Sequence, residues 1–523
     1  MEAKGVASGV LLTLTALFIL PPLLLPSSRR GSGGGERFGE ASLVRTVAGR
    51  ARALVDEALG VPSGTSGSGS GMGKVGHGRK ASVTVDIHPH VHKRECRLPE
   101  VPHIADTGVL PRPVANVNQR EESNSKYSEE VSQQEVILAT PIRRSRRARA
   151  AEELAFHRAG PRKEIAFSPG DVTAAVVTCG DLSCPGTNAV LAHIVMTLRN
   201  NYGVDRVIGF RYGFEGMLDK NEDLVDLTLD SVRNRSLSPG SLLGNSKGGF
   251  DCRRVLQRLQ SLEINQFYII GGMTALKNAA ELTAEVRRQN LPIVVAVVPK
   301  TLDDAMALMD TPFGYSTATD EAVRILDAVT TDAHCARNGI SIVKLMGQKS
   351  GFLAAGAVCA SSQADLCLIP EVPFRLDGDD GVLAYVERHL RRHRHMVIVV
   401  ADGAGADLLD AATPDIGLLL SKRIEAHLRR VQMPFSMVYH DPGPIITARP
   451  PNATDAQHAF LLGVNVVHGG MHGYTGFVCC LVSGRCVYIP LTTIMAMEPR
   501  RMNPKGRVWE RVLSVTQQPA KMY

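Results

Sequence analysis

Two carboxylates beside a lysine form an arrangement in this sequence that could carry catalytic chemistry. Asp303 and Asp304 follow an apolar run that ends at Val298, and Lys300 and Thr301 stand just before them. A carboxylate in this setting can take a proton from a hydroxyl group, and the neighbouring cation can stabilise transferred charge. A structural role is the alternative, because an aspartate at this point can also cap the segment that follows.

Glycine turns that could approach a phosphate group occur in three places. Gly180 follows a predicted strand, the loop 243–249 combines Lys247 with hydroxyl and amide side chains, and Gly271 and Gly272 end another strand. Small residues at such turns let backbone N–H groups and a helix N-terminus contact phosphate. Simpler readings stay open, since any tight turn favours glycine and Lys247 could lie on an ordinary surface turn.

Polar or glycine-containing loops also follow two later strands. Met346 and Gly347 end one strand, and Glu371 follows the next. Glu371 could accept hydrogen bonds from sugar hydroxyl groups, or it could cap a helix or form an ion pair. The residue after Gly272 is Met273, whose thioether is not a magnesium ligand. The residues at that turn therefore predict only a tight turn with an inward-facing methionine.

The elements that must position these residues are apolar strands alternating with amphipathic helices. Helical spacing is clear, for example, at Leu383, Val386 and Leu390. Strands are expected at residues 173–178, 207–211, 267–270, 293–298, 340–345, 366–369 and 396–401. This alternation predicts an α/β protein with two doubly wound, largely parallel-sheet lobes and a cleft between them. In such sheets the binding site lies at the carboxyl ends of the strands, where all the loops above except 243–249 occur.

Composition and charge are ordinary for a globular protein. The chain has 523 residues, 44% of them hydrophobic and 21% charged, which allows two or three domains. The net charge of +7 comes partly from basic runs at 143–147 and 391–394, which are typical of solvated faces. With one Trp and few aromatic residues there is no stacking platform for single strands, so no nucleic-acid partner is predicted.

The ten cysteines do not form a disulfide framework or a metal site. No CxxC motif occurs, and the histidines are not spaced as metal ligands. A reducing compartment, with thiols packed as small hydrophobic groups, is the better interpretation.

The N-terminal quarter of the chain differs in character from the rest. We expect an apolar targeting or membrane-anchor segment at 1–30, a disordered low-complexity linker at 31–134, and the two-lobed domain at 135–523. Residues 5–28 lack charge, which permits a membrane span, a cleaved targeting peptide or an unstructured extension. The arginines that follow predict a cytoplasmic domain tethered to a membrane, with a plastid as the alternative. Within the linker, the Pro-bounded segment 97–104 is expected to pack on the folded domain.

From about Phe156 to its end, the chain resembles the ATP-dependent 6-phosphofructokinase family, and particularly its plant type. The supporting stretches include AAVVTCGDLSCPGTN, LLGNSKGGFD, PKTLDD, GISIVKLMGQKSGF, PNATDA and VVHGGMHGYTGF. The resemblance implies two α/β lobes, ATP and Mg²⁺ as cofactors, and fructose 6-phosphate as substrate. It also implies a homo-oligomer, or a hetero-oligomer with active relatives.

Site residues carry over from the family by position. Asp303 matches the catalytic base that takes the proton of the sugar hydroxyl. Nucleotide-site positions are implied at Gly180, Lys247, Gly271 and Gly272, and substrate contacts at Thr301, Met346, Gly347 and Glu371.

The sequence departs from the family pattern in the same loops. Met273 replaces the aspartate that holds magnesium in the family, so no metal ligand is predicted there. Thr274 replaces the next residue, which is glycine in family members that use ATP and aspartate in those that use diphosphate. Gln348 replaces an arginine. Thr447 stands where the family arginine grips the sugar phosphate, and Arg449 is a candidate substitute.

Two functions follow from these residues. One is phosphoryl transfer from ATP to fructose 6-phosphate in glycolysis, with weak activity. The other is a non-catalytic, ligand-binding or regulatory subunit of phosphofructokinase assemblies.

Overall fold

The computed structural model describes residues 82–85, 94–108, 113–116, 130–139, 154–180, 183–219, 224–302, 306–409 and 414–522. The predicted apolar segment 1–30 lies outside these residues, as do most of the predicted linker and the aspartates Asp303 and Asp304. The chain divides into two compact units, Met1–Gly78 and Arg79–Tyr523, and everything below concerns the second.

The larger lobe is built on a nine-stranded sheet with the order β4-β5-β17-β16-β11-β10-β7-β8-β9. Its five inner strands are β7 (Thr173–Thr178), β8 (Arg206–Phe210), β10 (Gln266–Gly271), β11 (Val294–Pro299) and β16 (Phe477–Val482). These five pair in parallel. Four antiparallel strands complete the two edges, namely β4 (Val136–Leu138), β5 (Ala155–Arg158), β17 (Arg485–Pro490) and β9 (Val225–Asp226).

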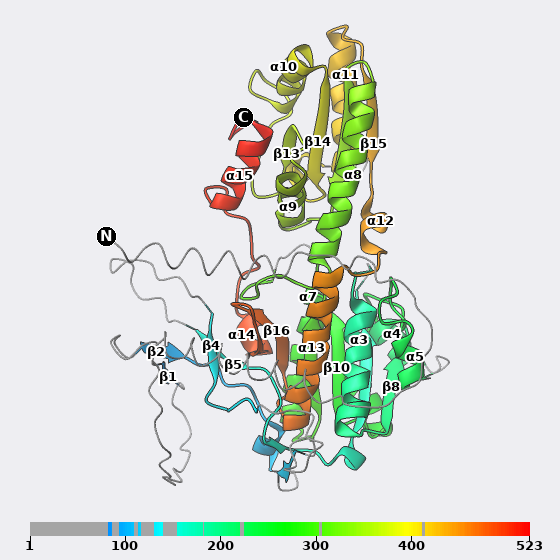
Figure 1. Cartoon of the computed structure of the whole chain (residues 1–523), viewed down its shortest axis with the longest axis vertical. Coiled ribbons are helices and arrows are strands. Elements are labelled where there is room, and N and C mark those ends of the chain that lie inside the picture. The colour runs from blue at the N-terminus through cyan, green and yellow to red at the C-terminus, as the bar shows by residue number, and fades with distance from the viewer. Residues whose placement is uncertain are drawn as a thin grey trace, which may run out of the picture. The chain divides into compact units, whose positions relative to one another are not determined.

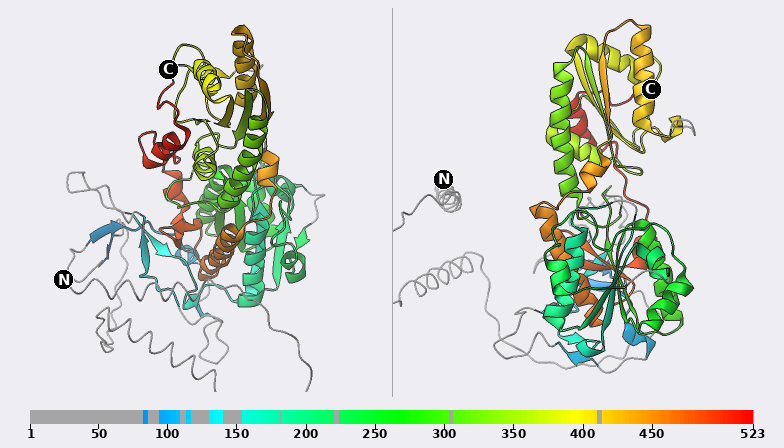
Figure 2. Two further views of the ribbon diagram at one scale, coloured as in Figure 1. Left: turned by 45° about the horizontal axis from the view of Figure 1, so that its top comes forward. Right: turned by 90° about the vertical axis from the view of Figure 1, so that its right-hand side faces the viewer.

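Helices cover both faces of this sheet, which explains why apolar side chains of its inner strands point to both faces. Val176 and Ile270 face a core that includes α3 (Thr187–Met196) and α13 (Ala453–His472). The alternate residues of the same strands, such as Val177 and Ile269, face a second core with α6 (Cys252–Ser261) and α7 (Met273–Arg288). The right-hand view of Figure 2 shows helices on the two sides of the sheet.

The smaller lobe contains a four-stranded parallel sheet with the order β13-β14-β12-β15. Its strands are β12 (Gly339–Leu345), β13 (Leu366–Leu368), β14 (His395–Ala401) and β15 (Ser436–His440). One face packs on α8 (Tyr315–Cys335), α9 (Phe352–Ser361) and α15 (Arg507–Thr516). The other packs on α10 (Val382–His393) and α11 (Ile416–Arg430). Figure 1 shows these elements around the sheet.

The predicted fold class, two largely parallel α/β lobes, is confirmed, and each of the seven predicted strands is present within two residues of its expected bounds. The strands of the two main sheets that were not predicted lie at the sheet edges or in the last part of the chain: β4, β5, β9, β15, β16 and β17. In β15, exposed and half-buried positions alternate, so it lacks the continuous apolar run that marked the others.

The Pro-bounded segment 97–104 packs on the folded domain, as predicted. Val101 and Ile104 are buried. The backbone N–H of Ile104 donates to the Gly473 carbonyl at 3.0 Å, and that of Thr475 donates to the Pro102 carbonyl at 2.9 Å. In the described part of the chain, no helix has both the length and the apolar character needed to cross a membrane.

Candidate functional site

A pocket of about 310 Å³ lies at the carboxyl ends of the parallel strands and is lined by both lobes. The larger lobe contributes the loops after β7, β10 and β11, and the smaller lobe contributes the loops after β12 and β14. Six residues predicted for the site line this pocket: Gly180, Lys247, Gly272, Thr301, Met346 and Gly347. The position agrees with the general rule for open α/β sheets.

The turn after β7 requires a glycine. Gly180 has φ +115°, which side chains rarely adopt, and its N–H donates to the Ser246 carbonyl at 3.0 Å. A Cβ atom at this position would lie 3.3 Å from both Cε and Nζ of Lys300. The absence of a side chain therefore lets the lysine ammonium group lie against the backbone of the turn.

Lys300, the cation that the sequence analysis places beside Asp303 to stabilise transferred charge, lines the pocket. Its side chain lies in the pocket wall with only 6% of the residue exposed, and Nζ is 3.0 Å from Oδ1 of Asn245. Its backbone N–H donates to the carbonyl of Gly271 at 2.9 Å. In the sequence, this residue is recognisable as a lysine directly before Thr301 at the end of a strand. The fold was needed to show that its ammonium group turns toward Gly180.

Gly271 and Gly272 differ in their roles. Gly272 is the N-cap of α7 and lines the pocket, whereas Gly271 is buried in β10. A Cβ atom on Gly271 would come within 2.4 Å of the Cβ of Ala275, so this glycine permits the close packing of helix on strand. Its proposed contact with a nucleotide stays a prediction.

The donor set at the start of α7 does not fit a magnesium ion. Met273 lines the pocket and packs against the core between β10 and α7, and the first turn of α7 contains no acidic residue. None of the described pocket residues from the larger lobe is a carboxylate. Magnesium in proteins is held by carboxylates together with substrate phosphates and water. Elsewhere among the described residues, no group of three or more His, Cys, Asp or Glu is arranged to hold a metal.

The smaller lobe contributes a wall without cations among its described residues. Met346, Gly347 and Gln348 follow β12, and Asp402 follows β14. Asp402 was not predicted, although its position directly after an apolar strand was a usable signal. Its backbone N–H donates to the Leu345 carbonyl at 2.9 Å, which joins the two strand ends.

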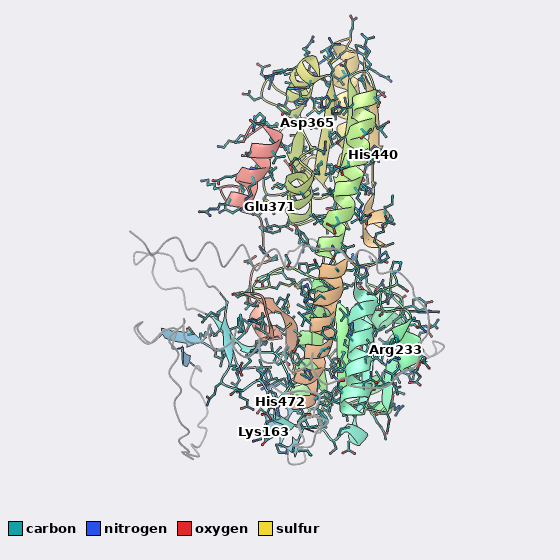
Figure 3. The ribbon with its side chains drawn as sticks, viewed as in Figure 1. Lys163, Arg233, Asp365, Glu371, His440 and His472 are labelled. Carbon is teal, nitrogen blue, oxygen red and sulfur yellow. The ribbon has the colours of Figure 1, made fainter. Side chains whose placement is uncertain are left out.

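Glu371 does not line the pocket, and both of its carboxylate oxygens accept backbone hydrogen bonds. Oε2 accepts from the N–H of Gly351 at 3.0 Å, at the N-terminus of α9, and Oε1 accepts from the N–H of Met502 at 2.8 Å. Figure 3 shows Glu371 on the side of the smaller lobe that carries α9 and α15. This geometry matches the capping role that was the alternative for this residue, while a sugar contact stays a prediction.

Arg449, the candidate substitute for the family arginine, is engaged outside the pocket. Its Nη2 lies 2.9 Å from Oε2 of Glu321 on α8, and its side chain is 44% exposed. Thr447 is only 3% exposed at the end of α12 (Gly443–Thr447). Neither residue lines the pocket.

Two thiols lie in the pocket wall, and both are poor nucleophiles. Burial raises the pKa of Cys179 and of Cys184 to about 12 in each case. All ten cysteines lie in the described part of the chain and none forms a disulfide. Six are buried, as expected for thiols that pack as small hydrophobic groups: Cys96, Cys179, Cys184, Cys367, Cys479 and Cys480.

Comparison with known proteins identifies the family. Residues 173–469 match the family model for phosphofructokinase. The chain is 40% identical over 378 residues to ATP-dependent 6-phosphofructokinase 7 of Arabidopsis thaliana, an alignment that covers 70% of this chain and 77% of the relative. This chain belongs to the phosphofructokinase family.

Two further comparisons extend this result. The phosphofructokinase named ATP-dependent 6-phosphofructokinase 4, chloroplastic, of Arabidopsis thaliana is 37% identical over 446 residues, covering 81% of this chain and 82% of the relative. A solved pyrophosphate-dependent phosphofructokinase from Marinobacter aquaeolei aligns with a TM-score of 0.56 and 19% identity, covering 66% of this chain and 91% of that one. At that identity the solved structure supports the fold alone. The family generally uses ATP and Mg²⁺, binds fructose 6-phosphate and is oligomeric.

Proposed function

We propose that this phosphofructokinase-family chain binds a nucleotide in the pocket and slowly transfers its terminal phosphoryl group to the 1-hydroxyl of fructose 6-phosphate, as a step of glycolysis. The observation that carries this proposal is the meeting of Gly180, Lys247, Lys300 and Thr301 in one pocket at the strand ends. Cations and backbone N–H groups at such a point suit the negative charge of transferred phosphate.

In the proposed reaction, Asp303 removes the proton from the 1-hydroxyl of the sugar. The sugar oxygen then bonds to the terminal phosphorus, and the bond from that phosphorus to its bridging oxygen breaks. Asp303 lies outside the described residues, but Thr301 and Leu302, which precede it, line the pocket. Lys247 and Lys300 would stabilise the negative charge on the phosphate oxygens as the bonds exchange.

Three substitutions favour a low rate. Met273, Gln348 and Thr447 replace an aspartate and two arginines of the family pattern. Loss of one cation that stabilises the transition state costs about 10³-fold in rate or more, although several losses in one site do not simply add.

The test is an assay of the purified chain with fructose 6-phosphate, magnesium, and either ATP or diphosphate. Asp303→Asn preserves the size of the side chain but cannot accept the proton, so we expect kcat to fall about 10²- to 10⁴-fold while the Kd for ATP is unchanged. The proposal fails if the unaltered chain shows no turnover with either donor while sugar phosphate or nucleotide raises its Tm.

That outcome would favour the second candidate, a non-catalytic subunit that binds ligands and assembles with active relatives. It is supported by the use of Glu371 and Arg449 in contacts within the fold. Co-expression with an active relative, followed by affinity purification, measures assembly directly. A mixed oligomer whose kinetics differ from those of the active relative alone would support this candidate.

The domain organisation and localisation also remain proposals. We propose segments 1–30, 31–134 and 135–523 as above, with the domain in the cytoplasm and residues 5–28 as a membrane tether. The chloroplastic relative, which aligns over 81% of this chain, supports the plastid alternative. A fusion of residues 1–60 to a fluorescent protein separates the cases, because a soluble cytosolic signal would refute both.

A further inference from the structure

Among the described residues of the pocket, which do not include the proposed base Asp303, the charged groups are divided unequally between the two walls. Among the described residues of the larger-lobe wall there are two lysines and no carboxylate, whereas the smaller-lobe wall has Asp402 and no cation. We infer that the pocket holds the polyphosphate of a nucleotide through direct contacts with Lys247 and Lys300, and that this binding does not require a magnesium ion. The inference rests on the proposed nucleotide pocket.

The start of α7 supports binding without a metal. Met273 presents a thioether, and the neighbouring polar residues of the wall, Ser183, Thr274 and Asn278, offer neutral oxygen atoms alone. Neutral oxygens without a carboxylate are weak magnesium ligands. Met273 is also packed against the core, so its side chain occupies space rather than leaving it for a hydrated ion.

The two lysines suit direct contact with phosphate in complementary ways. Lys300 is buried and oriented, with Nζ 3.0 Å from Oδ1 of Asn245 and its side chain against Gly180. Lys247 is exposed on the same loop as Asn245 and lines the pocket. A charge-assisted contact between an ammonium group and a phosphate oxygen is roughly twice as strong as a neutral hydrogen bond.

Asp402 sets the direction in which the ligand lies. Its carboxylate is in the wall formed by the smaller lobe, where it repels phosphate and can accept hydrogen bonds from hydroxyl groups. A nucleotide without bound metal carries more negative charge than its magnesium complex. The metal-free nucleotide should therefore be attracted more strongly by Lys247 and Lys300, and repelled more strongly by Asp402, than the magnesium complex.

The first experiment measures ATP binding to the purified chain by calorimetry, once with EDTA and once with MgCl₂. The expected result is a Kd in EDTA equal to or lower than that in MgCl₂. Binding that is lost in EDTA and restored by magnesium would overturn this inference and leave the proposed function intact. Absence of binding in both buffers would overturn the proposed nucleotide pocket as well.

Substitutions then test the lysines. In EDTA, Lys247→Met should weaken ATP binding by about tenfold, the effect of losing one charge-assisted contact. Lys277→Met is the matched control, because Lys277 is exposed on α7 and does not line the pocket. Lys247 lies on the surface, so its replacement does not threaten folding. An unchanged Kd in Lys247→Met would overturn the assignment.

Met273→Asp provides a test in the opposite direction. A carboxylate at the N-terminus of α7 should make ATP bind more tightly in MgCl₂ than in EDTA, by about tenfold, and should also suit the helix dipole. If this variant keeps the magnesium response of the unaltered chain, residue 273 does not control metal use and that part of the inference is wrong.

Discussion

The two lobes contribute walls of different kinds to the same pocket. The larger lobe places Lys247 and Lys300 beside a glycine turn, while the smaller lobe places Met346, Gln348 and Asp402 opposite. The difference lies in what each lobe does with its polar side chains. The larger lobe directs them into the pocket, whereas in the smaller lobe Glu371 is used to hold backbone groups together.

This contrast separates two functions that one active site normally combines. Phosphate binding needs cations, and the larger lobe supplies Lys247 and Lys300. Recognition of a sugar phosphate needs a second set of polar groups, and two of the charged residues expected to contribute to it, Glu371 and Arg449, have partners elsewhere in the fold. This contrast is the reason for the proposal above that the chain binds a nucleotide but transfers its phosphoryl group slowly.

Among the substitutions that test this comparison of the two lobes, replacement of Glu371 should have the largest effect. Glu371→Ala should lower the free energy of unfolding by about 3 kcal/mol, because the N–H groups of Gly351 and Met502 lose a charged acceptor. ATP affinity should not change. Denaturant unfolding and calorimetry measure the two quantities. A weakened sugar-phosphate affinity at unchanged stability would instead make Glu371 a ligand-binding residue.

The lobes should also differ in their response to acid. In the larger lobe, burial, aided by the charge of Arg162, lowers the pKa of His468 to about 3. Burial also lowers that of His472 to about 4, despite a hydrogen bond to the Glu164 carbonyl. Figure 3 marks His472 near the end of α13. The unfolded chain takes up protons near the ordinary histidine value of 6.5, so stability is complete above about pH 7 and falls as the pH is lowered.

By about pH 5.5 the two histidines together should cost up to about 2 to 3 kcal/mol of unfolding free energy. In the smaller lobe the half-buried Lys344 pairs with both Asp415 and Asp441. Burial alone would raise the pKa of Asp415, but hydrogen bonds from Lys344 and other groups lower it, so its contribution is lost only in stronger acid, below about pH 4. Urea unfolding at several pH values measures the slope. If His468→Gln leaves the dependence of unfolding free energy on pH unchanged, His468 is not a source of the acid sensitivity.

Replacement of Arg449 should have the smallest effect on stability. Its pair with Glu321 is partly exposed, so Arg449→Ala should lower the free energy of unfolding by less than about 1 kcal/mol. The KM for fructose 6-phosphate, if turnover is measurable, should stay the same. A large rise in KM would contradict the comparison, because it would show that the smaller lobe and its neighbours retain a sugar-phosphate cation.

The parts of the fold and site that could be predicted are those determined by local sequence. Strands such as β7 and β10 contain continuous apolar runs, and the residues that follow them, including Gly180 and Gly272, had to lie at one edge of the sheet. The direction of Lys300 could not be predicted, because it depends on Gly180 and Asn245 in separate loops. The partner of Glu371 could not be predicted either, since Met502 is 131 residues away along the chain.

The strand order of the larger sheet has a consequence for biosynthesis. Strand β11 ends at residue 299, and its neighbour β16 begins at residue 477, after the whole four-stranded sheet of the smaller lobe. During translation the smaller sheet can therefore assemble first, while one edge of β11 waits for its partner. An unpaired edge of an apolar parallel strand invites incorrect pairing. The nascent chain is thus most exposed to misassembly after β15 has emerged and before β16 is complete.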